Sequence, residues 1–317
     1  MPHLLIAGKL HPAGLALLEG RDGFTHDYVE EVSERSYAPL IGRADALVIR
    51  TQPLSSTTIA QAARLKIVSR HGVGYDSVDI TTLNKRRIPL CVVDDVNSLS
   101  VAEHAFMLIL AGAKRLIRAD RSVREGPWGW RNALEAGEIS GKNLLIIGYG
   151  RAGRHLARMA QGFAMQTRAF DPFLLEQGWP DGPTAPVASL ADGLAWADVI
   201  SVHAPKAGRP ILGAREFAQV KPGVVIVNTA RGGVVDEGAL AAAFAEGQVG
   251  AAGLDVFGDE PPAKDHPLLG LDQVVLTPHI AGLTRQAAKR MAVSCVQNVF
   301  DFFAGRLNPD LIVNREF

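Results

Sequence analysis

The stretch "NLLIIGYGRAGRHLARMA" (143–160) has the pattern of a strand that turns directly into a helix. An apolar run leads into Gly148, and Gly150 and Gly153 complete the spacing Gly-x-Gly-x-x-Gly. In such a turn the first glycine permits the tight bend, the second lets the backbone approach a pyrophosphate, and the third lets the helix pack against the strand. The start of the helix offers N–H groups and a partial positive charge. The stretch therefore predicts a dinucleotide-binding fold.

A carboxylate stands where this interpretation requires one. The segment "TRAF" (167–170) is a second predicted strand, and Asp171 follows it, 23 residues after Gly148. That is near the usual distance for an acid that binds a ribose 2′-hydroxyl. Pro172 and Phe173 come next, with no arginine for a 2′-phosphate, which favours NAD over NADP. Arg168, three residues upstream, leaves the alternative open.

The bulk properties narrow the class of protein. The chain of 317 residues carries 33 Lys plus Arg and 33 Asp plus Glu, so its net charge gives no sign of a nucleic-acid partner. The uncharged apolar run 105–113 is too short to span a bilayer, and the first residues do not resemble a signal peptide. Two cysteines and no C-x-x-C indicate a reduced, cytoplasmic setting without a metal site. From the charge balance and the short apolar run, we expect neither a nucleic-acid partner nor a membrane partner.

Short apolar runs alternate with helical patterns along the chain, which predicts α/β architecture with parallel sheets covered on both faces. The predicted strands form two series, 3–8, 46–50, 66–70 and 90–93, then 143–148, 167–170, 198–202, 223–228, 250–256 and 273–277. A long helix over 100–125 separates the series. Ser100 and Glu103 have capping-box spacing, so we interpret Glu103 as part of a helix cap. A last helix over 287–304 ends at Gly305. Two doubly wound units are expected, the second inserted into the first.

Four more segments keep a characteristic order with the glycine turn: "HGVGYDSVD" (71–79), "VNTARGGVVDE" (227–237), "GLDVFGDEPP" (253–262) and "LTPHIAG" (276–282). Together they resemble the D-isomer-specific 2-hydroxyacid dehydrogenase family, especially its phosphoglycerate-dehydrogenase-like branch. The resemblance covers nearly the whole chain. It implies a flavodoxin-like substrate domain, 1–98 with 285–317, and an inserted Rossmann NAD domain, 99–284. It also implies a homodimer, with the helix that begins near Ser100 helping to form the contact.

The resemblance further implies roles for single residues. Arg231, Glu260 and His279 match the catalytic set: the arginine holds the substrate carboxylate, and the glutamate pairs with the acid/base histidine. Val73 and Gly74 match backbone donors to the substrate carboxylate. Asp255 matches a residue that hydrogen-bonds the nicotinamide amide. The positions that match the family's cofactor-binding residues are Gly148, Gly150, Arg151, Ala152, Gly153, Asp171, His203, Pro205, Thr229, Ala230, Asp255 and Gly282.

The chemistry supports these roles independently of the family. Reduction of a 2-keto acid builds negative charge on oxygen, which needs a proton donor such as His279, and a nearby carboxylate favours its imidazolium form. A guanidinium suits a substrate carboxylate. Alternatives exist for each residue: His279 as a core histidine, Arg231 as a surface arginine at a helix start, Asp255 as a turn residue, and Glu260 as a solvated loop acid beside Asp259.

The substrate is less defined. Arg50, in "VIRTQPLS" (48–55), matches an arginine near the substrate in the phosphoglycerate-like branch, or it is a solvated strand-end residue. Small acidic 2-hydroxy or 2-keto acids are expected, with hydroxypyruvate, glyoxylate and phosphite as alternatives and an NAD-sensing corepressor-like protein as a further one. Glu260 stands where formate dehydrogenases carry glutamine. The segment "KAGRPILG" (206–213) departs from the family, and no appended regulatory domain is expected.

Overall fold

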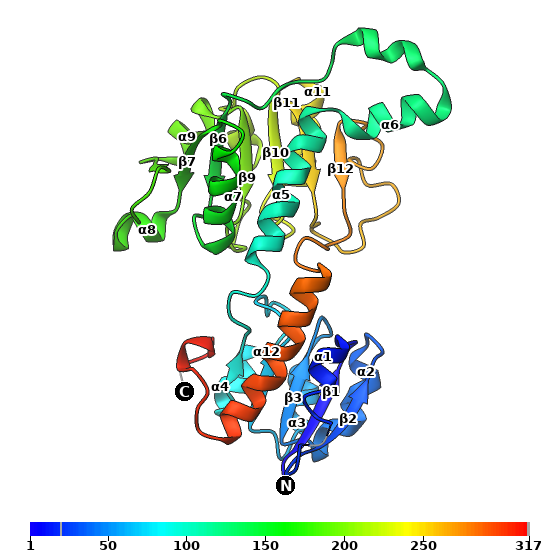
Figure 1. Cartoon of the computed structure of the whole chain (residues 1–317), viewed down its shortest axis with the longest axis vertical. Coiled ribbons are helices and arrows are strands. Elements are labelled where there is room, and N and C mark those ends of the chain that lie inside the picture. Colours follow the sequence, from blue (N-terminus) through cyan, green and yellow to red (C-terminus); the bar gives the residue numbers. More distant parts are fainter. Residues whose placement is uncertain (20, 316–317) are drawn as a thin grey trace. The chain divides into compact units, whose positions relative to one another are not determined.

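The computed structural model describes residues 1–19 and 21–315 and divides into two compact units, residues 1–97 with 283–317 and residues 98–282. The second unit is thus inserted into the chain of the first (Figure 1). We refer to them as unit 1 and unit 2. Residues 316 and 317 of the predicted substrate domain lie outside the described residues.

Unit 1 contains a parallel sheet that has five strands in the described part of the chain, in the order β2-β1-β3-β4-β5. This is the flavodoxin-like order, whose ligand-binding switch point lies between the first and third strands. The elements are β1 (His3–Ala7), α1 (Pro12–Leu15), β2 (Thr25–Val29), α2 (Glu34–Tyr37), η1 (Ala38–Arg43), β3 (Ala46–Ile49), α3 (Ser56–Gln61), β4 (Ile67–Arg70), α4 (Ile80–Lys85), β5 (Leu90–Cys91), α12 (Arg285–Phe303) and η3 (Pro309–Leu311).

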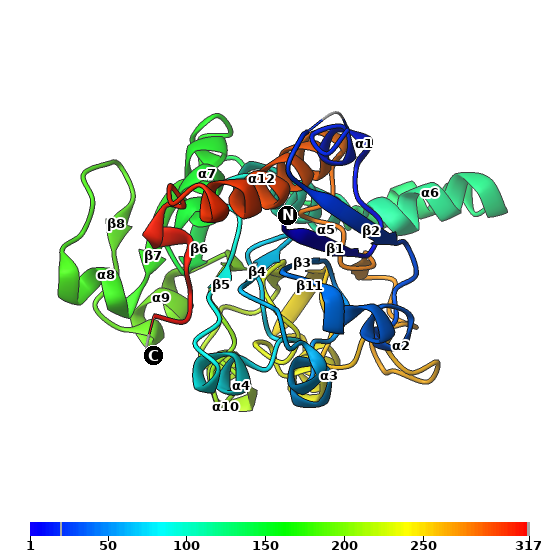
Figure 2. The same cartoon turned by 90° about the horizontal axis from the view of Figure 1, so that it is seen from below.

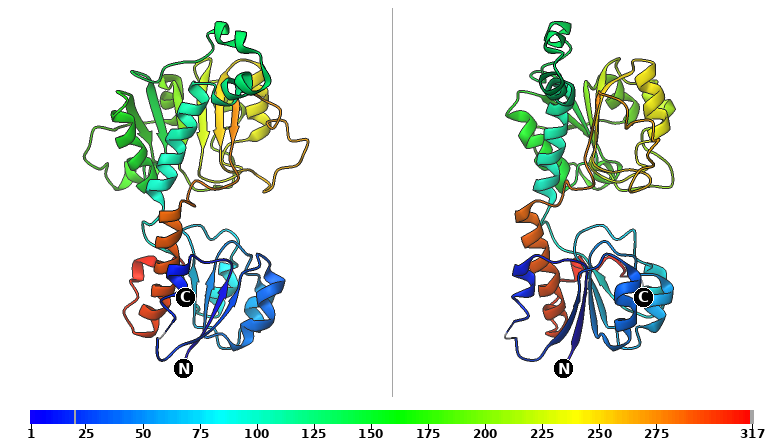
Figure 3. Two further views of the ribbon diagram at one scale, coloured as in Figure 1. Left: turned by 45° about the vertical axis from the view of Figure 1, so that its right-hand side comes forward. Right: turned by 90° about the vertical axis from the view of Figure 1, so that its right-hand side faces the viewer.

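The inner strands β1, β3 and β4 of unit 1 are buried and largely apolar on both faces because helices cover both. Along β1, Leu4 and Ile6 pack in one core cluster with α12, whereas Leu5 and Ala7 pack in another with residues of α3 and α4. Figure 3 shows α12 on one side of this sheet and α2, α3 and α4 on the other. The period of two along the strand thus sorts its side chains between two cores.

Unit 2 holds a parallel sheet with the order β12-β11-β10-β9-β6-β7-β8 within the described residues. This is a Rossmann order with its switch point between β6 and β9. The elements are α5 (Ser98–Ala113), α6 (Leu116–Glu125), η2 (Trp128–Ala133), β6 (Asn143–Ile147), α7 (Arg151–Gln161), β7 (Gln166–Phe170), α8 (Pro172–Gln177), β8 (Ala185–Pro186), α9 (Leu190–Trp196), β9 (Val199–Val202), α10 (Ala214–Phe217), β10 (Val224–Asn228), α11 (Glu237–Ala245), β11 (Val249–Leu254) and β12 (Val274–Leu276). The predicted fold class is confirmed.

Two details of the predicted elements are wrong. The helix expected over 100–125 is two helices, because Arg115 adopts a left-handed conformation (φ +54°) between α5 and α6, and its guanidinium donates to the Gly250 carbonyl. The first helix begins at Ser98, so Ser100 lies inside it and not at the N-cap position that the capping-box spacing predicts. Asn97, Ser98 and Ser100 are all residue types that cap helices, so composition alone could not place the start.

The sequence pattern does not predict the strands β2 and β8. The residues of β2 are mostly polar and half-exposed, which suits an edge strand, and β8 is a two-residue strand at the end of the Pro- and Gly-rich segment 178–186. Both are edge strands, where one open side removes the apolar pattern that marks a buried strand.

From α6 onward the chain projects from the body of unit 2, as Figures 1 and 2 show. Large apolar side chains are exposed on this arm (residues 116–134): Leu116, Val123, Trp128 and Leu134 are 51%, 65%, 62% and 86% accessible. No helix among the described residues combines the length and apolar character needed to cross a lipid bilayer.

Candidate active site

His279 follows the last strand of the sheet and forms a close pair with Glu260. Its Nδ1 lies 2.7 Å from Glu260 Oε2, and the other carboxylate oxygen accepts a hydrogen bond from the Phe257 backbone N–H at 3.1 Å. The His279 side chain is 52% exposed, so it is accessible rather than part of the core. The carboxylate engages Nδ1, which leaves Nε2 as the ring nitrogen that can deliver a proton. This geometry is that of an oriented acid/base histidine.

His279 has an unusual backbone. Its φ is +53°, a left-handed conformation that costs energy for a residue with a side chain. Asp255 surrounds this turn with acceptors: its carbonyl accepts from His279 N–H at 2.8 Å, Oδ1 from Ile280 N–H at 2.9 Å, and Oδ2 from Ala281 N–H at 2.8 Å. Three successive N–H groups bonded to one residue hold the turn.

Asp255 therefore has a structural role in addition to the cofactor contact that the resemblance implies. The resemblance implies that it hydrogen-bonds the nicotinamide amide, but its side chain is fully buried and both carboxylate oxygens already accept hydrogen bonds from the turn. The nicotinamide contact stays a prediction, and it would have to share one of these acceptors. The visible function of Asp255 is to fix the segment that carries His279.

Arg231 stands at the end of β10, on a turn organised by Asn228. The Asn228 side chain accepts from the Ala230 N–H and donates to the Arg231 carbonyl, both at 3.0 Å, and the Arg231 guanidinium donates to the Ala230 carbonyl at 2.8 Å. Sequence reasoning assigns Asn228 no role, although it stands inside the motif and ends a buried strand. Its amide closes the turn that presents the arginine.

The turn of Arg231 touches the loop of Glu260. A Cβ at Gly232 would overlap the backbone of Phe257 and Gly258, so only a glycine permits this approach. The structure thus brings together the loops that carry the three predicted catalytic residues within unit 2, since Glu260 in turn contacts His279. The strands place these loops at the carboxyl edge of the sheet, where ligands bind in α/β folds.

Glu260 and His279 also line a pocket of about 380 Å³ with mostly apolar walls. The other lining residues are Phe257, Pro261, Pro262, Leu269, Leu276, Thr277 and Pro278.

The glycine turn lies at the switch point of the sheet, after β6. Gly148 has φ +91°, and a Cβ there would come within 2.8 Å of the backbone of His203 and Ala204. Gly150 is open, with nothing within 4 Å of an added Cβ, and it precedes α7, which has no side-chain cap. Arg151 and Ala152 begin that helix, and an added Cβ at Gly153 would collide with the Gly148 carbonyl. Gly148 and Gly153 thus allow the close backbone contacts expected of them, and the role of Gly150 toward a pyrophosphate stays a prediction.

Asp171 is tied to this turn. Its Oδ2 accepts a hydrogen bond from the Tyr149 N–H at 2.9 Å, and its Oδ1 accepts one from the Leu174 N–H at 3.2 Å as the cap of α8. Arg168, which left NADP open as an alternative, places its guanidinium 4.5 Å from the centre of the Trp196 ring. A stacked arginine is engaged elsewhere.

Two buried polar atoms at the same sheet edge lack a protein partner among the described residues: His203 Nδ1 and Thr229 Oγ1. His203 Nε2 contacts Ser201 Oγ at 2.9 Å, and burial lowers the pKa of His203 to about 4, so the ring is neutral at physiological pH. Buried polar atoms without partners are rare in proteins, and a bound ligand is one way in which they gain partners. With the glycine cradle and Asp171, they fit a dinucleotide. Pro205, Ala230 and Gly282 lie on the neighbouring loops.

In unit 1, the predicted substrate residues stand at the carboxyl edge of its own sheet. Arg50 follows β3, and the turn of Val73 and Gly74 follows β4, where the Arg70 Nε donates to the Gly74 carbonyl at 2.7 Å. Three buried atoms here have no protein partner among the described residues: Arg50 Nε, Gln52 Oε1 and His71 Nε2.

Arg50 brings a positive charge to this edge. Burial first, and the charge of Arg50 second, lower the pKa of His71 to about 4. The edge of unit 1 therefore combines a cation with polar atoms that lack partners, which suits an anionic ligand. Gln52 and His71 are not singled out by the sequence, because nothing in the order of residues shows that their polar atoms lack partners.

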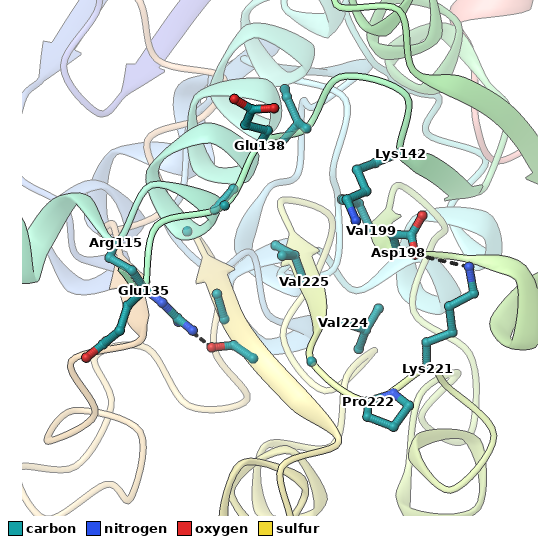
Figure 4. Close-up of a pocket in the computed structure, with 17 residues that line it drawn as sticks. Arg115, Glu135, Glu138, Lys142, Asp198, Val199, Lys221, Pro222, Val224 and Val225 are labelled. Carbon is teal, nitrogen blue, oxygen red and sulfur yellow. Dashed lines mark hydrogen bonds and ion pairs between the residues drawn. The ribbon is translucent and has the colours of Figure 1, made fainter. Parts of the chain in front are cut away.

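A second pocket in unit 2, of about 250 Å³, lies at the opposite edge of the sheet (Figure 4). It is lined by the amino ends of β9, β10 and β11, by Glu135 and by residues 137–139. Lys221 and Asp198 form an ion pair of 3.0 Å on its wall. None of the predicted site residues lines it. The described residues contain no group of three or more His, Cys, Asp or Glu side chains arranged for a metal ion.

Comparison with known proteins agrees with this geometry. The profile of the D-isomer specific 2-hydroxyacid dehydrogenase NAD binding domain matches residues 106–281. A D-3-phosphoglycerate dehydrogenase of Archaeoglobus fulgidus is 39% identical over 268 residues, which cover 84% of this chain and 50% of that protein. A glyoxylate reductase of Korarchaeum cryptofilum is 34% identical over 324 residues, 99% of this chain and 96% of that protein. The chain spans about half the length of the curated phosphoglycerate dehydrogenase from Archaeoglobus.

Among solved structures, the chain is similar to the D-lactate dehydrogenase from Aquifex aeolicus, crystallised with NAD and lactic acid. The TM-score is 0.84, the sequences are 27% identical, and the match covers 98% of this chain and 99% of the other.

Proposed function

Because the chain belongs to the D-isomer specific 2-hydroxyacid dehydrogenase family, we propose that it interconverts a small acidic 2-keto acid and the D-2-hydroxy acid, with NAD(H) as the second substrate. The observation that carries the proposal is the 2.7 Å pair of His279 and Glu260 beside the turn of Arg231. It supplies a proton donor and a carboxylate anchor on adjoining loops, which is the chemistry that keto-acid reduction needs.

The residues divide the work. The bound cofactor supplies the hydride. His279 delivers a proton from Nε2 to the oxygen on which negative charge develops, and Glu260 orients the ring through Nδ1. Arg231 binds the substrate carboxylate and polarises the neighbouring carbonyl. In the oxidative direction His279 accepts the proton.

The cofactor would lie along the carboxyl edge of unit 2. Gly148, Gly150 and the start of α7 would hold the pyrophosphate, and Asp171 would hold the adenosine ribose. His203 Nδ1 and Thr229 Oγ1 would gain partners they lack within the protein. We propose NAD over NADP, because the Asp171 carboxylate repels a 2′-phosphate and Arg168 is stacked on Trp196.

For the substrate, we propose a keto acid with a second anionic group. The support is the edge of unit 1, where Arg50 stands with buried polar atoms of Gln52 and His71 that lack protein partners. A phosphate or second carboxylate would complete this edge, and Val73 and Gly74, on the turn after β4, would offer backbone N–H groups to an acidic substrate. Hydroxypyruvate and glyoxylate are the alternative substrates. The chain is similar to a hydroxypyruvate reductase and a glyoxylate reductase as well as to phosphoglycerate dehydrogenases.

The test is NADH oxidation with 3-phosphohydroxypyruvate, hydroxypyruvate and glyoxylate, repeated with NADPH. We expect turnover with NADH, with the highest kcat/KM for the phosphorylated acid. A preference for glyoxylate would replace the proposed substrate class and keep the reaction. Lack of turnover with every keto acid, together with tight NADH binding, would overturn the proposed reaction in favour of an NAD-sensing role.

We also propose that the protein is a homodimer in the cytoplasm. The projecting arm exposes the large apolar side chains of Leu116, Val123, Trp128 and Leu134, which a second copy would cover. Cys91 and Cys295 are free thiols buried in one core cluster, as expected in a reducing compartment. Light scattering of the wild type and of Trp128→Glu tests the dimer: a wild-type monomer contradicts it.

A further inference from the structure

His104, on the buried side of α5, reaches the segment that carries His279. Its Nε2 lies 2.9 Å from Thr277 Oγ1, although 173 residues separate the two in the chain. The ring is largely enclosed, with 15% of the side chain exposed. The motifs that predict the site do not include this histidine.

The direction of the hydrogen bonds follows from counting protons. Thr277 Oγ1 has one proton and donates it to Asp255 Oδ1 at 2.5 Å. It therefore has only acceptor capacity left for His104, so Nε2 of His104 must carry a proton and donate it. His104 fixes which way the threonine hydroxyl points, and the hydroxyl in turn fixes one oxygen of the carboxylate.

That carboxylate holds the strained turn. Asp255 Oδ1 and Oδ2 accept the N–H groups of Ile280 and Ala281, directly after the left-handed His279. Such a conformation persists only where surrounding contacts over-determine it. If Asp255 rotates, the two N–H groups lose their partners, and the turn can relax toward an ordinary backbone conformation that moves the His279 ring.

We propose that His104 is a positioning residue, which acts through Thr277 and Asp255 to keep the His279 turn in the conformation that aims the imidazole. Its catalytic consequence rests on the proposed function, but its structural consequence does not. His104 acts through Thr277 and Asp255 on the orientation of His279, the proton donor, and it makes no contact with substrate or cofactor in this proposal. Small errors in the position of a catalytic group cost rate with little effect on binding.

The electrostatics of the ring agree with a neutral donor. Burial lowers the pKa of His104, although the nearby Asp255 carboxylate, with an oxygen 3.6 Å from Nε2, opposes the shift. A neutral ring with its proton on Nε2 can make the bond to Thr277 without placing a second charge beside the buried carboxylate.

The test compares His104→Leu, which removes the donor, with His104→Gln, whose amide N–H₂ replaces Nε2. We expect His104→Leu to lower kcat about tenfold with the Kd for NADH unchanged, and His104→Gln to restore most of the loss. His3→Leu is a matched control, because the His3 side chain is also 15% exposed and makes two polar contacts, but within unit 1. It should leave kcat near the wild-type value.

A measurement without turnover separates this inference from the proposed reaction. Hydrogen exchange of peptides that cover 279–283 should be about tenfold faster in His104→Leu than in the wild type and in His104→Gln, because the Ile280 and Ala281 amides lose protection. Unchanged exchange in this segment would overturn the inference even if the enzyme is active. A wild type without keto-acid turnover, with faster exchange in His104→Leu, would overturn the reaction alone.

A double-variant cycle identifies the route. If His104 acts through the hydroxyl, adding His104→Leu to Thr277→Val should change kcat and exchange by less than about twofold. Independent, multiplying losses would show that His104 does not act through Thr277 and would overturn the proposed route.

Discussion

The switch points of the two sheets are built alike, but the helices that come after them differ. In unit 2, Gly148 ends β6 with φ +91° and lies against the backbone of His203; in unit 1, Gly8 comes after β1 with φ +99° and lies against Arg50 and Gln52. After Gly148 the chain enters α7, a helix of 11 residues without a side-chain cap. After Gly8 it enters α1, a helix of four residues capped by the His11 side chain.

This difference shows what separates two parallel sheets of similar build. A long helix with an uncapped start offers N–H groups and a partial positive charge to phosphates. A short helix whose N-terminal N–H is already bonded does not. At its edge, unit 1 instead has the Arg50 guanidinium and polar side-chain atoms of Gln52 and His71 that lack protein partners among the described residues. One edge is suited to a dinucleotide and the other to a small anion.

The largest expected effect tests the assignment of the chemistry to unit 2. His279→Ala should lower kcat about 10³-fold, because it removes the proton donor, while the Kd for NADH stays within about twofold. Steady-state kinetics and NADH fluorescence titration measure the two quantities. Full activity in His279→Ala would remove this residue from the mechanism.

The second prediction uses a feature that the two units share. His71 in unit 1 and His203 in unit 2 both have a pKa of about 4, below the ordinary 6.5. The unfolded chain therefore takes up these protons at higher pH than the folded chain. Their contribution to stability is complete above pH 6.5 and is lost as the pH falls toward 4, on the order of 3 kcal/mol for each histidine.

Tryptophan fluorescence can separate the two contributions, because Trp128, Trp130, Trp179 and Trp196 all belong to unit 2. We expect His203→Asn to flatten the pH dependence of the unfolding transition seen by fluorescence. His71→Asn should leave the transition seen by fluorescence unchanged. It should flatten the pH dependence of the remaining transition, which circular dichroism of the whole chain detects. A wild-type unfolding free energy that does not change between pH 4 and pH 6.5 would contradict the prediction.

The third prediction compares the two glycines directly. Gly148→Ala places a Cβ within 2.8 Å of the His203 carbonyl at a positive φ and should weaken NADH binding about 30-fold. Gly8→Ala introduces similar strain in unit 1, where its Cβ would lie 2.8 Å from that of Arg50. It should reduce thermal stability and leave NADH affinity unchanged. Equal losses of NADH affinity would erase the distinction between the two edges.

The smallest expected effect concerns the edge of unit 1. Arg50→Ala should raise KM about tenfold for 3-phosphohydroxypyruvate and leave KM for glyoxylate nearly unchanged, because only the first has a second anion to lose its partner. Arg50→Lys should restore part of the loss, since it keeps the charge. An equal rise of KM for both acids would remove this role from Arg50.

Several parts of the fold could be predicted because they depend on local patterns. The apolar runs indicate the buried strands, and the glycine spacing indicates the turn into α7, since a tight turn and a close helix allow few residue types. The edge strands β2 and β8 lack such a pattern, and the break at Arg115 arises where the chain is otherwise a good helix former. Its guanidinium bonds a carbonyl 135 residues away, which no local pattern contains.

The same division holds in the site. The order of the motifs by itself determined that a histidine, a carboxylate, an arginine and a glycine turn come after parallel strands, and that such ends converge at one edge. Only the tertiary structure decided how they are held: the left-handed turn at His279, the three hydrogen bonds to Asp255, and the reach of His104 to Thr277. The reason is physical. Residue type limits which bonds a side chain can make, but its partners are chosen by packing between segments distant in the chain.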